Sequence, residues 1–177
     1  MSTLTTPPKV LICLGLLYRR DLYDQDQILE SLQLPFKVFS QFNDVPTSIA
    51  TMKTYYSKEM GAIDYLQRDF VVFENLVDRE QLVDLKLQSD LFEKKFSIDG
   101  KRMINLDFGV ISLENMVLST GKSFSHRIYI KDGVYGELTY QTINNSYQTL
   151  TWTYPDYMHR DVIQFFDLAR NYLKALL

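Results

Sequence analysis

Apolar and polar positions along the first part of the chain predict a strand, a helix and a second strand. Residues 10–17 are continuously apolar, which is typical of a strand covered on both faces. Asp24, with Gln27 three residues later, matches the capping box that begins a helix, and Pro35 ends that helix. Polarity then alternates over residues 36–42, as expected of a second strand.

The same kind of pattern resumes after residues 43–61, which have no clear period. Residues 66–74 predict a strand, Asp78 predicts the start of a helix, and residues 102–108 alternate as a further strand. A short helical turn is expected at residues 113–118. The order strand, helix, strand, strand, helix, strand is the connectivity of a ferredoxin-like unit.

A β-hairpin is predicted for residues 125–131 and 134–141, on either side of an Asp-Gly turn signal. A two-residue turn would mix apolar and charged side chains on both faces of this hairpin. A three-residue loop with Gly133 in the left-handed conformation separates them, and we favour it because a register slip moves every side chain to the other face. The pairs expected in this register are Arg127–Glu137, Ile128–Gly136 and Ile130–Val134.

Together these elements predict an α+β fold with a mostly antiparallel sheet. Its core is expected to be a ferredoxin-like βαββαβ unit, extended by a C-terminal β-hairpin and a final helix whose apolar residues keep helical spacing from Val162 to Leu176. We expect the helices to pack on one side of the sheet. Residues 1–177 predict a single domain, in which residues 1–8 form a flexible N-terminal arm.

Composition and charge narrow the class of protein. The formal net charge is −3, which gives no support to general nucleic-acid binding, because such binding uses a basic field to displace counterions. Cys13 is the only cysteine, so there is no disulfide framework, and its apolar neighbours predict a buried thiol. Residues 10–17 are fewer than the ~20 of a membrane span, and Arg19 and Arg20 follow them where a signal peptide has small residues. We therefore expect a cytoplasmic protein with no membrane partner.

Polar and aromatic motifs occur in a characteristic order along nearly the whole chain. They are Glu59-Met60-Gly61, Asn105-Leu106-Asp107-Phe108-Gly109, Leu118-Ser119-Thr120, His126-Arg127-Ile128-Tyr129, Tyr135-Gly136-Glu137-Leu138-Thr139 and Trp152-Thr153-Tyr154-Pro155-Asp156-Tyr157. In this order and spacing, from about Lys9 to the last helix, the chain resembles DUF4416, a prokaryotic family of unknown function.

The resemblance implies a free-standing cytoplasmic domain, and it carries over no catalytic or cofactor residue. The chain departs from the family pattern at two positions, with Phe108 in place of a proline and Gly136 in place of an alanine. Without the proline, the turn that the resemblance implies at residues 105–109 is less constrained.

Motifs for common chemistries are incomplete. Gly-Lys-Ser at residues 121–123 lacks the first glycine of a phosphate-binding P-loop, because Met116 occupies that position. His126 and His159 are far apart and lack the spacing of metal ligands. Ser125 and His126 are neighbours in a predicted strand, so they point to opposite faces and do not form a nucleophile–base pair.

The polar faces of the predicted strands indicate a cleft for a ligand. Its expected floor is Asn105, Asp107, Arg127, Tyr129, Glu137 and Thr139. Its expected rim is Tyr55, Tyr56, Glu59, Thr153, Tyr154, Asp156 and Tyr157. Arg127 would take an anionic group, Asp107 and Glu137 would accept hydroxyls or amines, and tyrosines would supply ring faces. The first hypothesis is therefore a binding site for a small anionic metabolite or nucleotide.

Two other functions stay open from the sequence alone. One is a metal-assisted phosphoryl or nucleotide hydrolase, in which Asp107 and Glu137 hold the cation. The other is a protein-interaction domain that uses exposed aromatic side chains. Arg127 and Glu137 are themselves either a structural ion pair or one that faces a ligand.

Overall fold

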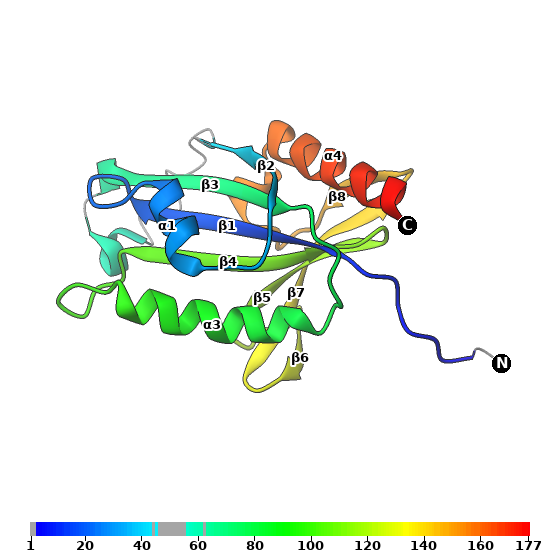
Figure 1. Ribbon diagram of the computed structural model, residues 1–177, viewed down its shortest axis with the longest axis horizontal. Coiled ribbons are helices and arrows are strands. Elements are labelled where there is room, and N and C mark those ends of the chain that lie inside the picture. The colour runs from blue at the N-terminus through cyan, green and yellow to red at the C-terminus, as the bar shows by residue number, and fades with distance from the viewer. Residues whose placement is uncertain (1–2, 44, 46–55, 62) are drawn as a thin grey trace.

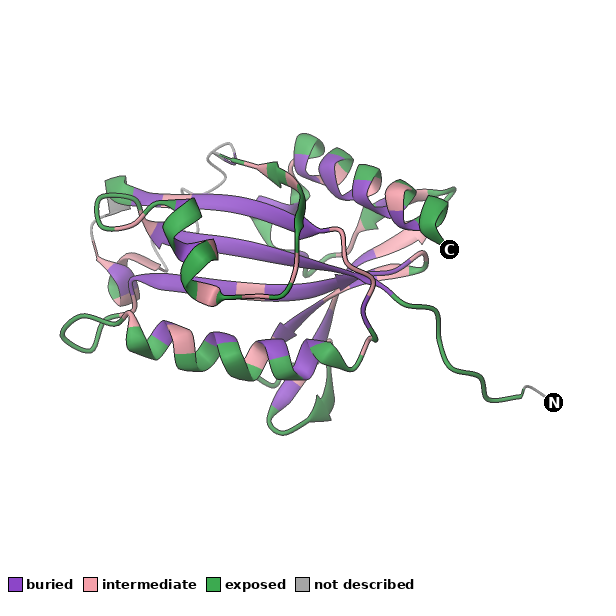
Figure 2. Ribbon diagram, in the orientation of Figure 1, coloured by how far each residue is buried: buried purple, intermediate pink, exposed green. Residues whose placement is uncertain are grey.

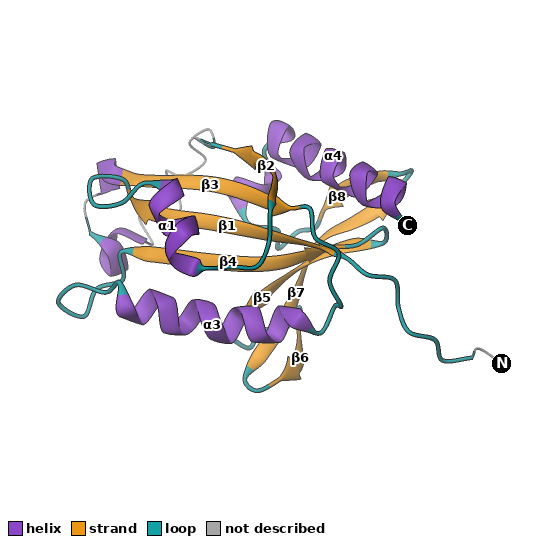
Figure 3. Cartoon of the chain, viewed as in Figure 1, coloured by secondary structure: helices purple, strands orange, loops and turns teal. Residues whose placement is uncertain are grey.

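The computed structural model describes residues 3–43, 45, 56–61 and 63–177, which form a sheet flanked by helices (Figures 1 and 3). Residues 56–60 are helical, in addition to the labelled elements. The labelled elements are β1 (Leu11–Arg19), α1 (Gln25–Leu32), β2 (Val38–Phe42), η1 (Ile63–Tyr65), β3 (Leu66–Phe73), α3 (Gln81–Lys95), β4 (Ile104–Ile111), β5 (Asn115–Thr120), β6 (Arg127–Lys131), β7 (Val134–Ile143), β8 (Ser146–Thr149), η2 (Pro155–Met158) and α4 (Arg160–Leu176).

The strands form an eight-stranded sheet in the order β2-β3-β1-β4-β5-β7-β6, with β8 paired to β7 beside β6. All neighbouring strands are antiparallel. This confirms the expected α+β class with an antiparallel sheet, a C-terminal hairpin and a final helix. Residues 3–9 have no regular structure, are exposed, and extend away from the sheet in Figure 1.

Helices cover both faces of the sheet, so the expectation that they pack on one side is wrong. Ile12 of β1 lies in a core with Ile28 of α1 and Leu82 of α3. Leu11, its neighbour, lies in a second core with Phe166 of α4. Because successive residues of a strand point to opposite faces, a strand that is apolar at every position needs a cover on each side. Figure 2 shows the central strands buried along most of their length.

Sequence signals located the start of helix α1 correctly, but they misplaced the start of α3 and missed strand β5. Asp24 caps α1, and the capping box with Gln27 is present on both sides. The second helix begins only at Gln81, with Glu80 as its N-cap residue, not at Asp78. The helical turn expected at residues 113–118 is wrong: these residues enter strand β5, because alternate side chains fill the core beneath α4.

The hairpin of β6 and β7 combines features of both turns considered from the sequence. Asp132 and Gly133 have φ of 50° and 81°, and Lys131 pairs with Val134, so the turn has two residues. A bulge between Tyr129 and Lys131 then shifts the register. The predicted pairs Arg127–Glu137 and Ile128–Gly136 are confirmed, whereas the predicted pair Ile130–Val134 is wrong.

Strands β4 and β5 pair over only three residues each and then separate, which creates a fork in the sheet. The paired residues are 109–111 of β4 and 116–118 of β5. At the apex of the fork, the Ser119 hydroxyl donates to the Phe108 carbonyl at 2.9 Å. Along the free edge of β4, the Leu106 N–H donates to a carboxylate oxygen of Glu93 at 2.7 Å. Figure 1 shows β5, β7 and β6 turning away from β4.

Residues 105–109 are part of strand β4, so the turn implied there by the family resemblance is wrong for this chain. Phe108, which stands where the family pattern has proline, is 1% exposed and packs in the core beneath α1 and α3. A phenylalanine continues the strand and fills that core. In the described part of the chain, no helix is both long and apolar enough to cross a membrane.

Candidate functional site

A cleft of about 670 Å³ lies in the fork between β4 and β5. Its volume falls within the range of roughly 300–1,000 Å³ that is common for small-molecule sites. The lining is mixed, with charged, hydroxyl and aromatic side chains. The lining residues are Tyr56, Lys86, Asp90, Glu93, Arg102, Asn105, Asp107, Ser119, Thr120, Gly121, Lys122, Phe124, Arg127, Tyr154 and Pro155.

Arg68 is a buried arginine that crosses the sheet behind this cleft. It starts on β3, and its side chain is 2% exposed. A Cβ atom at Gly15 of β1 would lie 2.8 Å from the Arg68 Nη2 and 2.7 Å from the Tyr157 hydroxyl. The absence of a side chain at Gly15 therefore makes room for the guanidinium over β1. From there Arg68 reaches Asp107 of β4, with 3.0 Å from Nη1 to Oδ2, and Asp156 of η2, with 2.8 Å from Nε to Oδ2.

The two carboxylate oxygens of Asp107 differ in their contacts. Arg68 and the Asn105 amide both donate to its Oδ2 atom, the latter at 2.9 Å. Among the described residues, no hydrogen bond is formed by Oδ1, and Asp107 lines the cleft. Asn105 in turn accepts from Arg102 at 2.8 Å, which fixes the orientation of its amide. The arrangement presents one carboxylate oxygen to a ligand in a fixed direction.

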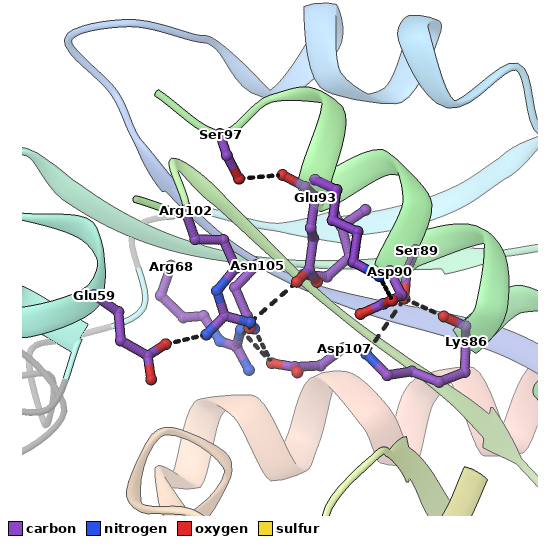
Figure 4. A network of polar contacts seen from close by, with 12 residues as sticks. Glu59, Arg68, Lys86, Ser89, Asp90, Glu93, Ser97, Arg102, Asn105 and Asp107 are labelled. Carbon is purple, nitrogen blue, oxygen red and sulfur yellow. Dashed lines mark hydrogen bonds and ion pairs between the residues drawn. The ribbon is translucent and has the colours of Figure 1, made fainter. Parts of the chain in front are cut away.

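Arg102 extends this network from Asn105 to Glu93 and Glu59, as Figure 4 shows. It pairs with Glu93 of α3 at 3.0 Å and with Glu59 of the helical segment at residues 56–60. We call the connected set the acidic wall, and its members are Glu59, Arg68, Glu93, Arg102, Asn105, Asp107 and Asp156.

Two carboxyl groups of the acidic wall, Asp156 and Glu93, have raised pKa values. Burial raises the pKa of Asp156 above its usual range, and Arg68 offsets only part of that effect. Burial also raises the pKa of Glu93, although the Leu106 N–H, Lys86 and Arg102 oppose it. For both carboxyl groups, the cost of burying the charge exceeds what the neighbouring cations and hydrogen-bond donors restore.

The opposite side of the cleft carries the basic wall, which we define as Lys122 and Arg127. The Arg127 Nε pairs with the buried Glu137 at 2.7 Å, and its Nη1 donates to the Lys122 carbonyl at 3.0 Å. Its Nη2 donates to the Tyr154 hydroxyl at 2.8 Å. Burial, together with the nearby Glu137 carboxylate, raises the pKa of Tyr154 to about 12, although Arg127 opposes the shift. Tyr154 therefore keeps its proton at neutral pH.

The aromatic segment at residues 152–157 ties the two walls together. On the basic side, the Trp152 indole donates to the Leu138 carbonyl at 2.8 Å, and Tyr154 holds Arg127. On the acidic side, Asp156 pairs with Arg68. Tyr157, which is 1% exposed, packs its ring at 4.7 Å from that of Phe70. This short segment fixes the separation of the walls by packing and by hydrogen bonds.

The predicted site residues fall into separate groups in the structure. Five line the cleft: Tyr56, Asn105, Asp107, Arg127 and Tyr154. Four others hold the arginines from behind or beside the lining: Glu59, Glu137, Asp156 and Tyr157.

The remaining candidates have other positions. Thr153 donates to the Thr139 carbonyl at 2.7 Å, and both residues are buried. Tyr129 is 58% exposed and packs edge-to-face on Tyr135, outside the lining. Tyr55 lies outside the described residues.

Sequence reasoning missed Arg68, Arg102 and Glu93, although Arg68 and Glu93 each have a signal in the sequence. Arg68 is a charge within an otherwise largely apolar strand, which normally requires a buried partner. Glu93 is a carboxylate on the buried side of helix α3, which also carries Leu82 and Leu85. Their partners come from distant segments of the chain, so the sequence gives no direct sign of the network.

The described residues contain no group of three or more histidine, cysteine, aspartate and glutamate side chains that could hold a metal ion. Glu137 lies behind Arg127 and also contacts His126, with 3.2 Å between Oε2 and Nε2. It therefore does not face the cleft together with Asp107, as the hydrolase hypothesis requires.

The fold and the cleft define an α+β protein with one antiparallel sheet that is forked around a polar, charged site. The chain belongs to the DUF4416 family, whose description is "Domain of unknown function (DUF4416)" and whose family model matches residues 8–172. This confirms the resemblance seen in the motifs. No curated protein and no solved structure matched the chain.

Proposed function

We propose that this protein binds a small polar ligand in the cleft of the fork, and that an anionic group of the ligand lies at the basic wall. The observation that carries the proposal is the fixed position of Arg127 in the cleft lining. Glu137 and Tyr154 hold its guanidinium from two directions, so little conformational entropy is lost when it binds an anion.

The other lining groups suit the rest of such a ligand. Asp107 offers an acceptor to a hydroxyl or amine, and the protonated Tyr154 hydroxyl offers a donor. Tyr56, Phe124 and Tyr154 supply aromatic surface to a ring or an aliphatic stem. Several convergent polar groups beside apolar surface in a cleft are typical of ligand sites.

We also propose that the scaffold of the site is a ferredoxin-like core formed by β1 to β4 with α1 and α3. The order β2-β3-β1-β4, with antiparallel neighbours, supports this. So does the shared core of α1 and α3 on one face. The cleft would then be an addition, made where β5 leaves the edge of that core.

Binding is tested by calorimetric titration with inorganic phosphate, phosphate monoesters and nucleotides, each with and without Mg²⁺. At least one of these probes should bind, and Lys122→Ala should weaken it by about tenfold, because an exposed cation at the cleft is lost. Lys131→Ala is the matched control, since Lys131 is exposed at the tip of the β6–β7 hairpin and outside the cleft lining. Equal effects of the two variants, or no binding by any probe, contradicts the proposal.

A further inference from the structure

The structure assigns a charge pattern to the ligand: we infer that it is dipolar, with its anionic group at the basic wall and a protonated amine at the acidic wall. This inference rests on the proposed function and specifies the ligand of the same site. It is carried by the distribution of charge between the walls and by the Oδ1 atoms of Asp107 and Asp156, which have no hydrogen-bond donor among the described residues.

The acidic wall contains more carboxylates than cations. Two guanidinium groups, Arg68 and Arg102, serve four carboxylates: Glu59, Glu93, Asp107 and Asp156. Lys86 is nearby and its charge favours ionised Glu93, but in the described ranges its side chain hydrogen-bonds only Ser89, at 3.4 Å. Even if Lys86 is included, four carboxylates face three cations among the residues that the structure describes. The excess is of the sign that attracts an ammonium group.

Asp156 shows that one buried oxygen connected to this wall lacks a donor. It is 0% exposed, and within the described residues its Oδ1 atom has no hydrogen-bond partner, whereas its Oδ2 atom lies 2.8 Å from the Arg68 Nε. Its only strong partner is Arg68, which it shares with Asp107. A cation bound to the open Oδ1 of Asp107 would lessen the demand on Arg68 and leave more of its charge for Asp156.

An amine fits this position better than a neutral hydroxyl. A hydroxyl would satisfy one acceptor but would leave the excess charge, whereas an ammonium group supplies three donors and one positive charge. The basic wall repels an ammonium group and attracts an anion, so the two walls together fix the orientation of a dipolar ligand. The raised pKa values of Asp156 and Glu93 agree with a site that gains from one more cation.

The inference is tested with pairs of probes that differ in the amine. Calorimetric titration compares 2-aminoethyl phosphate with ethyl phosphate, and 3-aminopropyl phosphate with propyl phosphate. The better aminoalkyl phosphate should bind about tenfold tighter than its partner, which is a usual size for one charged hydrogen bond in a partly buried site. Asp107→Asn should remove most of this difference.

Two further variants test whether the amine preference depends on the charge of the acidic wall. Glu59→Gln removes one charge from the half-exposed end of the acidic wall and should reduce the amine preference by a smaller factor. Asp132→Asn is the matched control, because Asp132 is exposed in a turn with positive φ that asparagine adopts readily. It should leave the preference intact.

The outcomes distinguish the two proposals. If ethyl and propyl phosphate bind in a Lys122-dependent manner and the amine adds nothing, the dipolar ligand is wrong and the proposed function stands. An amine preference that survives both Asp107→Asn and Glu59→Gln also overturns the inference. If no phosphate binds, the proposed function fails and the inference fails with it.

Discussion

Arg68 and Arg127 are each tied to a buried carboxylate and to the segment at residues 152–157, yet their surroundings differ. Arg68 is 2% exposed, lies between two carboxylates and stacks near the ring of Phe70, with 5.0 Å from Cζ to the centroid. Arg127 is held by a single carboxylate, Glu137, and lines the open cleft. Arg68, buried between two carboxylates, therefore has a structural role. Arg127 is held by Glu137 and lines the cleft, so its guanidinium can contact a ligand.

The largest effect expected from this comparison is that of Arg68→Met on stability. Removal of the guanidinium leaves Asp156 buried without a counter-charge, which should lower the free energy of unfolding by about 3–5 kcal/mol. Urea denaturation measures it. Adding Asp156→Asn to Arg68→Met should recover part of the loss, because the orphaned charge is then absent. If Arg68→Met is as stable as the wild type, Arg68 does not have the structural role assigned to it.

Gly15→Ala should have the next largest effect. The added methyl group would meet the Arg68 guanidinium and the Tyr157 hydroxyl at less than 3 Å, so the buried cluster must shift, at about 1–3 kcal/mol. Gly121→Ala is the matched control, since a Cβ at Gly121 meets nothing within 4 Å, and it should change stability by less than about 0.5 kcal/mol. Equal unfolding midpoints for the two variants would contradict the close packing of the Arg68 side chain on Gly15 of β1.

How far the sequence predicts this molecule depends on the range of the interactions involved. The capping box of α1 and the pairing of Arg127 with Glu137 depend on neighbours in the chain or on one hairpin, and both were predicted correctly. Strand β5 was missed because its alternation is short and becomes clear only against the core beneath α4.

The acidic wall could not be derived from the sequence for a related reason. Arg68 comes from β3, Arg102 precedes β4, and Asp156 lies in η2, so their contact depends on the completed sheet. Gly15 contributes by lacking a side chain, which no sequence pattern marks as a crossing point. Of the residues predicted on strands, Asn105, Asp107 and Arg127 line the cleft. The buried charges that hold them in place come from segments distant in the sequence.

The pH dependence of stability tests the environment of the Arg68 cluster through Asp156. Asp156 has a raised pKa, chiefly because of burial, so it binds its proton more tightly in the folded chain. Its contribution to stability is then present below the unfolded pKa and is lost as the pH rises through the folded pKa. Relative to Asp156→Asn, the wild type should lose free energy of unfolding as the pH rises above about 4. Parallel curves of stability against pH for the two proteins would contradict this.

Tyr154→Phe should give the smallest effect. It removes the hydroxyl that accepts from Arg127 at 2.8 Å but keeps the ring, so a phosphate-bearing probe should bind only about threefold to tenfold less tightly, the usual range for one hydrogen bond. The unfolding midpoint should stay nearly the same, because Tyr154 is 38% exposed. A loss of stability without a loss of affinity would place Tyr154 with the Arg68 cluster instead.

The most direct test of the ligand cleft is a ¹H–¹⁵N NMR titration of the full chain with 2-aminoethyl phosphate. The account predicts that the largest shift changes occur at the backbone amides of residues 105–107 and 119–122, on the two arms of the fork. Shift changes confined to the exposed edge strand β6 at residues 128–131, or to α4, would contradict it.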